Sequence, residues 1–188
     1  MGNCNSSAIW VSSHVLEWGT IQLVSTARGL CGVAFPWSDP VAFAMWLHSR
    51  FGDRPWKNPR PGSAEEALHK RALLQLEEYF AGYRRAFDLP LDLTTGTAFQ
   101  QAVWSALLAI PYGQTRSYRE VAQAVGRPSA VRAVGQANRA NQLPVIVPCH
   151  RVIGSDGELR GYGGRDGAEV KSRLLKFEQL FMRFSADS

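Results

Sequence analysis

Three helix-start signals limit the fold of this chain more than any other feature of its sequence. Each is a capping box, in which a Ser or Thr side chain accepts a hydrogen bond from the backbone N–H three residues later and the Glu or Gln there reciprocates. The pairs are Ser63 with Glu66, Thr97 with Gln100 and Ser117 with Glu120. Apolar residues at helical spacing follow the first two pairs, so the sequence predicts helices that begin after residues 63, 97 and 117.

The chain before the first of these helices has the pattern of short strands. Short apolar runs at 9–11 and 30–35, and alternation of apolar Ile21 and Leu23 with polar neighbours over 20–25, predict a small antiparallel sheet, and a helix is expected over 40–51. The proline-containing stretch 87–93 is typical of an edge strand or an extended connection. The remainder is predicted to be helical. We therefore expect an α+β fold with an N-terminal α/β domain at 1–93 and a C-terminal helical domain at 94–188.

The helix that begins after Ser117 is followed almost at once by another. Gly126 ends the first, and Pro128 stands where the first residue of the second is expected. Two short helices joined so closely are typical of a helix-turn-helix. At 100° per residue the second helix has a face of small packing residues, Ala130, Ala133, Val134 and Ala137, and a polar, basic face, Ser129, Arg132, Gln136 and Arg139. That polar face is either a solvated surface or one that lies along a nucleic-acid groove.

The positive charge lies in the second half of the 188-residue chain. Residues 1–93 hold nine basic and nine acidic side chains, whereas residues 94–188 hold twelve and seven, so the net charge of +5 belongs to the C-terminal half. The range from Arg116 to Arg151 contains six arginines and a single acidic residue, Glu120. Arginine suits bidentate phosphate contacts, which makes nucleic acid the first partner to consider.

The sequence Pro148-Cys149-His150-Arg151-Val152 ends an apolar, strand-like run. A cysteine on a buried strand is usually inert, because desolvation raises the pKa of its thiol. The neighbouring His150 and Arg151 favour the opposite result, a thiolate that acts as a nucleophile. Neighbours on a strand point to opposite faces, so His150 reaches the sulfur only if the chain turns there or a water bridges the two groups.

Glu178 lies on the apolar face of the predicted last helix, together with Val170, Leu174 and Phe181. A carboxylate among apolar residues needs a partner. That partner is either His150, which would complete a Glu-His-Cys relay, or Lys171 or an arginine in a purely structural pair.

Composition limits the remaining possibilities. Three scattered cysteines make no disulfide framework, which favours a reducing compartment, and no apolar run is long enough to span a membrane. We therefore expect a cytoplasmic protein, or a nuclear one if the host is a eukaryote. Cys4, His14 and Cys31 lack the spacing of compact zinc motifs, so no metal site is expected.

Several segments together resemble one family, the O6-alkylguanine-DNA alkyltransferases. The resemblance extends over about residues 16–180. Its motifs are Glu78-Tyr79-Phe80-Ala81-Gly82, Gly96-Thr97 with Phe99-Gln100, Val103-Trp104, Ile110-Pro111-Tyr112-Gly113 with Ser117-Tyr118, Arg132-Ala133-Val134-Gly135, Asn141, the Pro148–Val152 motif, Gly161-Tyr162-Gly163-Gly164, and Lys171 with Leu174-Leu175 and Glu178. The spacing between Tyr162 and Lys171 is two residues longer than the commoner family spacing.

The resemblance implies the fold and the reaction. The N-terminal part would be a ribonuclease H-like roll, and the C-terminal part an all-α winged-helix or helix-turn-helix domain that enters the minor groove. The damaged nucleotide would be flipped out of duplex DNA, and its alkyl group would pass irreversibly from O6-alkylguanine to Cys149, with O4-alkylthymine as a further candidate substrate. One protein molecule would repair one lesion, as a monomer and without a cofactor.

The resemblance also implies residue roles. Cys149 would be the nucleophile, His150 its base through a water, and Glu178 the acid behind His150. Tyr118 would donate to the leaving base, and Asn141 would brace the turn. The DNA-binding candidates are Arg132, which would fill the vacated space, with Ser129, Ala130, Gln136, Arg139 and Arg151. The pocket candidates are Val152 and Cys149 through their carbonyl groups, Tyr162, and Gly163 through its amide.

Three other functions remain as alternatives. A non-enzymatic alkyltransferase-like protein would bind the lesion without repairing it, but such proteins usually have tryptophan where this chain has Cys149. A winged-helix transcription regulator would explain the basic helices but not Cys149, His150 and Glu178 together. A cysteine hydrolase would turn over and would not need Arg132.

Overall fold

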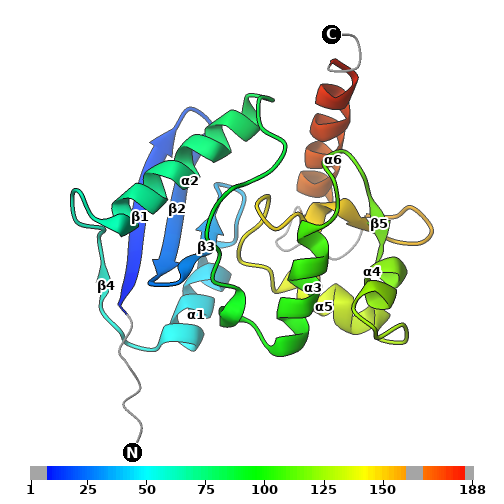
Figure 1. The fold of residues 1–188 in the computed structure, drawn as a ribbon, viewed down its shortest axis with the longest axis horizontal. Coiled ribbons are helices and arrows are strands. Elements are labelled where there is room, and N and C mark those ends of the chain that lie inside the picture. Colours follow the sequence, from blue (N-terminus) through cyan, green and yellow to red (C-terminus); the bar gives the residue numbers. More distant parts are fainter. Residues whose placement is uncertain (1–7, 160–166, 185–188) are drawn as a thin grey trace, which may run out of the picture.

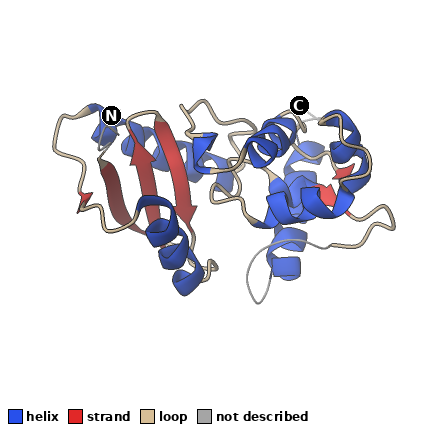
Figure 2. Ribbon diagram, turned by 90° about the horizontal axis from the view of Figure 1, so that it is seen from below, coloured by secondary structure: helices blue, strands red, loops and turns tan. Residues whose placement is uncertain are grey.

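We describe residues 8–159 and 167–184 of a computed structural model of the chain. Its first half is a four-stranded sheet with two helices, and its second half is mainly helical (Figures 1 and 2). The elements of the first half are β1 (Ile9–Leu16), β2 (Gly19–Thr26), β3 (Gly29–Ala34), α1 (Pro40–Phe51), β4 (Trp56–Lys57) and α2 (Ala64–Phe80). Those of the second half are η1 (Leu93–Thr95), α3 (Ala98–Leu108), β5 (Arg116–Ser117), α4 (Tyr118–Ala124), α5 (Val131–Arg139), η2 (Cys149–Arg151), β6 (Val152–Ile153) and α6 (Gly167–Phe184).

The sheet has the strand order β3-β2-β1-β4. β1–β2 and β2–β3 are antiparallel, as expected, and the short β4, which was not among the predicted strands, joins the edge of β1 in parallel. Alternate residues of β2 point to opposite faces, so Leu23 packs in the core that includes α2 while Val24 packs with Phe43 and Leu47 of α1. The two helices therefore cover opposite faces of the sheet, and α2 joins it to the second half.

The extended segment 87–92 connects the two halves. Leu30 donates its backbone N–H to the Pro90 carbonyl and accepts from the Asp92 N–H, which leaves a single bridge between Leu30 and Leu91 rather than a strand. One large core then continues from the sheet through α2 into α3, α4, α5 and α6. The expected connection is thus present as an extended segment that ties the second half to β3.

Helix starts differ in how well the sequence predicted them. Both reciprocal hydrogen bonds are present in the capping boxes of α3 and α4. At α2, Ser63 accepts from the Glu66 N–H as expected, but the Glu66 carboxylate accepts from the Gly62 N–H instead of closing the box on Ser63.

The helix-turn-helix is present as α4 and α5, with one error in the expected boundary. Pro128 is not the first residue of the second helix, because a turn closed by a hydrogen bond from Ala130 N–H to the Arg127 carbonyl delays the helix to Val131. The packing face of α5 also differs from the prediction: Val134 and Ala137 are buried as expected, together with Asn138, whereas Ala133, predicted to pack, is exposed. The second half is also not purely helical, since β5 and β6 pair in parallel.

Candidate active site

Cys149 lies in a turn rather than on the expected strand. Residues 143–147 form turns, Val145 has a positive φ of 72°, and residues Cys149–Arg151 form the 3-10 helix η2. A β-branched residue rarely adopts such a φ, so this backbone is maintained by the surrounding packing. The apolar run misled the sequence prediction because short buried segments have no periodicity that separates a strand from a packed turn.

Asn141 holds this turn together. Its Nδ2 group donates to the Val147 carbonyl at 2.9 Å and to the Cys149 sulfur at 3.1 Å, and its Oδ1 accepts from the Leu143 N–H at 3.0 Å. The structure thus confirms the expected contact of Asn141 with the turn and adds a direct hydrogen bond to the sulfur.

The thiol of Cys149 is buried, with 4% of the residue exposed. Burial raises the pKa of this thiol to about 11, although the Asn141 hydrogen bond and the positive charge of Lys171 act to lower it. Of the two alternatives that the sequence left open, burial therefore favours the protonated thiol in the DNA-free protein. The thiol holds its proton at neutral pH and needs a base.

His150 and Glu178 form a buried, hydrogen-bonded pair. His150 is fully buried, and its Nε2 lies 2.8 Å from Oε1 of Glu178. Of the two alternatives for the partner of Glu178, His150 or a structural pair with Lys171 or an arginine, the structure shows both His150 and an arginine, Arg151. The ionised carboxylate can only accept, so Nε2 carries the hydrogen and Nδ1 is the basic nitrogen. Burial lowers the pKa of His150, which keeps the imidazole neutral. Nδ1 is buried without a partner among residues 8–159 and 167–184.

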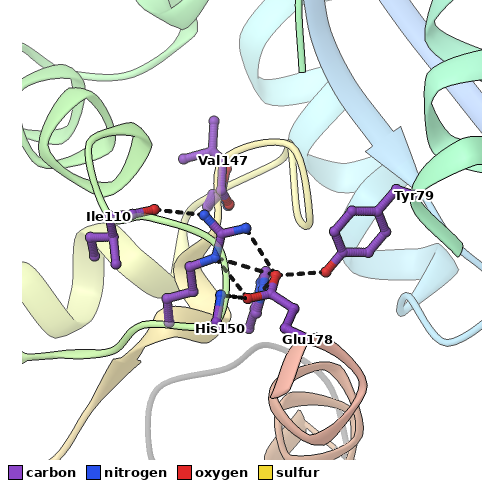
Figure 3. Close-up of polar contacts among 8 residues, drawn as sticks. Tyr79, Ile110, Val147, His150 and Glu178 are labelled. Atoms are coloured by element: carbon purple, nitrogen blue, oxygen red, sulfur yellow. Dashed lines mark hydrogen bonds and ion pairs between the residues drawn. The ribbon is translucent and has the colours of Figure 1, made fainter. Parts of the chain in front are cut away.

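Glu178 is the centre of a larger network (Figure 3). Arg151 donates to both of its oxygens at 2.9–3.2 Å, Tyr79 donates its hydroxyl to Oε1 at 2.7 Å, and the Gly113 N–H donates to Oε2 at 2.8 Å. Burial alone would raise the pKa of Glu178, but the hydrogen bonds from His150 and Arg151, together with the charge of Arg151, lower it to about 2. The carboxylate is therefore ionised throughout the physiological range.

Arg151 was expected on the DNA-binding surface, and this prediction is wrong. The residue is 6% exposed, and its Nη1 donates to the Ile110 carbonyl at 2.6 Å. A guanidinium beside a buried carboxylate relieves the desolvation of both charges, which is why this arginine turns inward.

Tyr118 and Lys171 form a second polar pair near the thiol. Lys171 Nζ lies 3.2 Å from the Tyr118 hydroxyl, and its side chain is fully buried. Burial lowers the pKa of Lys171 to about 8, with the negative charge of an ionised Cys149 acting in the opposite direction. The pair places an ammonium group close enough to influence both the sulfur and the phenol.

The basic face of the helix-turn-helix is exposed. Arg132, Gln136 and Arg139 are exposed on α5, while Ser129 and Ala130 lie in the turn before it instead of on the helix. Three of the predicted DNA contacts therefore share one solvent-facing surface, and two lie at its N-terminal end.

The pocket predictions are only partly within the described residues. Val152 is buried and pairs with Arg116 in the β5–β6 ladder, whereas Tyr162 and Gly163 lie outside the described residues. The Cys149 carbonyl, expected to accept from the base, already accepts from the Val152 N–H and from Asn138 Nδ2. A cleft of about 130 Å³ reaches Cys149 between the two halves, lined by residues that include Trp37, Asp39 and Asn141.

Two observations concern what the described residues lack. None of their helices is long and apolar enough to cross a membrane. Within residues 8–159 and 167–184 no three His, Cys, Asp or Glu side chains are placed to hold a metal ion, and Cys4 lies outside these ranges.

Sequence reasoning missed the roles of Tyr79, Gly113, Asn138 and Lys171 in this site. Tyr79 and Gly113 were noted only as parts of motifs, and Lys171 was considered only as a structural partner of Glu178. Nothing near Tyr79 in the sequence shows that it reaches Glu178. The one available signal was the position of Lys171 seven residues before Glu178, two helical turns along the same helix, which places both on one face.

The fold and site define a class of protein in which a buried cysteine, histidine and glutamate lie beside a helix-turn-helix. Two family models match: "6-O-methylguanine DNA methyltransferase, ribonuclease-like domain" at residues 15–93, and "6-O-methylguanine DNA methyltransferase, DNA binding domain" at residues 98–180. The chain belongs to the 6-O-methylguanine DNA methyltransferase family.

Individual relatives agree. The constitutive methylated-DNA--protein-cysteine methyltransferase of Bacillus subtilis is 58% identical over 106 residues. The matched residues are 56% of this chain and 63% of the relative, so this chain spans less than two thirds of that relative's length. The protein of that name in Mycolicibacterium paratuberculosis is 48% identical over 142 residues, 75% of this chain and 82% of the relative. The structure of Mycobacterium tuberculosis OGT in complex with DNA has a TM-score of 0.73 at 41% identity, over 92% of this chain and 94% of that one.

Proposed function

We propose that this chain repairs DNA by moving the alkyl group of O6-alkylguanine in duplex DNA to the sulfur of its own Cys149. The observation that carries the proposal is the site itself: the Cys149 thiol accepts a hydrogen bond from Asn141, and the next residue in the sequence, His150, is a buried neutral imidazole whose Nε2 hydrogen is fixed by Glu178. Such an arrangement activates a nucleophile without a cofactor. The names of the relatives support the same reaction.

The reaction begins with the thiol proton, which passes through a water to Nδ1 of His150. The thiolate attacks the alkyl carbon, the carbon–oxygen bond breaks, and the electron pair stays on the guanine oxygen. Tyr118, next to Lys171, donates a hydrogen bond as negative charge develops on the leaving base. The product is a thioether on Cys149, which has no easy reverse step, so each molecule reacts once.

Access to the lesion requires the nucleotide to leave the base stack. Arg132 on the exposed face of α5 fills the vacated space, and Gln136, Arg139, Ser129 and Ala130 contact the DNA around it. The minor groove carries little base information, which suits a protein that must find lesions in any sequence. Val152, Tyr162 and Gly163 contribute to the pocket, and O4-alkylthymine is a second candidate substrate.

The same proposal includes the organisation of the chain. The boundary between its two domains lies at residues 93 and 94, and the protein acts as a monomer. It works in the cytoplasm, or in the nucleus of a eukaryotic host, where thiols stay reduced.

The test is incubation with duplex DNA that contains O6-methylguanine, followed by mass analysis of the peptides. We expect one methyl group per protein molecule, on Cys149, and none in Cys149→Ser. Lesion binding without methylation would favour the non-enzymatic alkyltransferase-like alternative, and repeated turnover would favour a hydrolase. Preference for an undamaged DNA sequence would favour a transcription regulator.

A further inference from the structure

Tyr79 brings the sheet-bearing half of the molecule into the active site. It lies near the C-terminal end of α2, and its hydroxyl donates to Glu178 Oε1 on α6 across 99 positions of sequence, at 2.7 Å (Figure 3). The residue is fully buried, and its ring packs against those of Tyr112 and Phe177 with centroids 5.9 and 5.6 Å away. The geometry is therefore fixed by packing on several sides.

The oxygen that Tyr79 contacts is the one that orients His150. Oε1 of Glu178 accepts from Tyr79, from Arg151 and from His150 Nε2. Donors that share one oxygen divide its negative charge, so each weakens the attraction of the carboxylate for the others. Burial and the adjacent Glu178 charge raise the pKa of Tyr79 well above its usual range, so its hydroxyl remains a donor at every working pH.

We propose that Tyr79 is a positioning residue for alkyl transfer: its hydroxyl holds Oε1 of Glu178 toward His150 and limits how strongly the carboxylate favours the protonated imidazole. The inference rests on the proposed function of Cys149. It gives the first half of the chain a part in the chemistry, because the hydrogen-bond network around Glu178 is complete only when α2 is docked against α6.

Other charged groups around Glu178 and His150 also influence the pKa of His150. Arg151 from η2 and Lys171 from α6 both oppose protonation of His150, while Glu178 favours it. Tyr112, from the loop after α3, lies near Glu178, and the guanidinium groups of Arg85 and Arg151 face its ring at 5.9 and 5.6 Å. All of these remain in place when only the Tyr79 hydroxyl is removed.

The direction of the expected change follows. Without the Tyr79 donor, Oε1 interacts more strongly with the Nε2 hydrogen of His150, and the protonated imidazole becomes more favourable. The pKa of His150 should therefore rise in Tyr79→Phe, by about half a unit for the loss of one neutral hydrogen bond. Since only neutral His150 accepts the thiol proton, the acidic limb of the rate–pH profile should move up by the same amount.

Tyr112→Phe is the matched control. Its hydroxyl is also buried and close to Tyr79, but it has no hydrogen-bond partner among residues 8–159 and 167–184. This variant removes the same atom from the same region without touching Oε1. The His150 titration and the acidic limb should both stay where they are in the unaltered protein.

Two measurements test the proposal. NMR titration of His150 in the full-length, unreacted protein needs no repair activity, so it remains informative even if the proposed function fails. The second measurement is the rate of single-turnover methyl transfer as a function of pH, which gives the position of the acidic limb. An upward shift of about half a unit in both, for Tyr79→Phe and not for Tyr112→Phe, supports the role.

Three results would overturn it. The His150 titration could stay unchanged in Tyr79→Phe, both phenylalanine variants could shift it equally, or the transfer rate could fall by the same factor at every pH. An equal fall in rate at every pH would indicate a loss of stability alone, and a parallel thermal-unfolding measurement would identify that loss.

Discussion

Cys31 and Cys149 lie in different halves of the chain and share almost the same burial, yet their surroundings differ. Cys31 in β3 is 1% exposed, and its thiol donates to the Val24 carbonyl, 3.4 Å away. Burial, reinforced by the negative charge of Asp92, raises its pKa far above the usual range. Cys149 instead receives a hydrogen bond from Asn141 and faces the charge of Lys171. Donors and a nearby base, not exposure, distinguish the candidate nucleophile from a core thiol.

The largest effect is expected from Glu178→Gln, which removes the carboxylate that orients His150. The neutral amide is a weaker acceptor for the Nε2 hydrogen of His150, so methyl transfer should slow by about 100-fold. It also leaves Arg151 without its counter-charge, so the free energy of unfolding should fall by about 3–5 kcal/mol. Glu169→Gln, in an exposed pair with Arg173 on the same helix, should change stability by at most about 0.5 kcal/mol. Single-turnover rates and denaturant unfolding check both.

The same carboxylate gives this prediction a pH dependence. Because the pKa of Glu178 in the folded protein is about 2, below that of an unfolded glutamate, its contribution to stability is present above about pH 4 and is lost as the pH falls toward 2. The stability difference between Glu178→Gln and the unaltered protein should therefore shrink at low pH. A constant difference, or transfer within threefold of normal, would contradict the relay.

Asn141→Ala removes the donor to the sulfur and the brace of the turn. We expect transfer to slow by roughly 30-fold and stability to fall by about 2 kcal/mol, because the Val147 carbonyl and the Leu143 N–H lose their partner as well. Gln142→Ala is the neighbouring control, since that side chain makes only a long contact, 3.4 Å, with the Ala140 carbonyl. Similar rates for the two variants would show that the bond to the sulfur is unimportant.

Lys171→Gln should slow transfer by about tenfold at pH 7, because the ammonium group stabilises the thiolate. The pKa of Lys171 is about 8, so this advantage is present below pH 8 and fades above it. The rates of the variant and the unaltered protein should therefore converge in alkaline solution. Lys176→Gln, exposed on the same helix, is the control. A gap that persists at pH 10 would mean that Lys171 acts through packing alone.

Cys31→Ala should have the smallest effect. Transfer should stay within about twofold, and stability should fall by about 1 kcal/mol through the lost packing of a small buried side chain. Peptide mass analysis after incubation with methylated DNA should find the label on Cys149 only. Methylation of Cys31 in the unaltered protein would break the distinction between the two thiols.

The parts of this structure that the sequence predicted are those controlled by local chemistry. The boxes at Thr97 and Ser117 formed because their partners are three residues away, and the contact of Glu178 with His150 could be proposed because a carboxylate on an apolar face needs a partner. Arg151 was misplaced because an arginine is usually exposed, and only the folded chain shows that it lies beside a buried acid. The reach of Tyr79 to Glu178 joins distant segments and leaves no local pattern.

The left-handed backbone at Val145 has a consequence for the order in which the chain folds. Valine disfavours this conformation when no tertiary contacts hold it, so the loop that carries Cys149 does not preorganise. Val145 is fully enclosed in the core that joins the sheet to the helices. We therefore expect the loop to acquire its shape only after both halves have packed together, with the sulfur of Cys149 among the last groups of the chain to reach its native position.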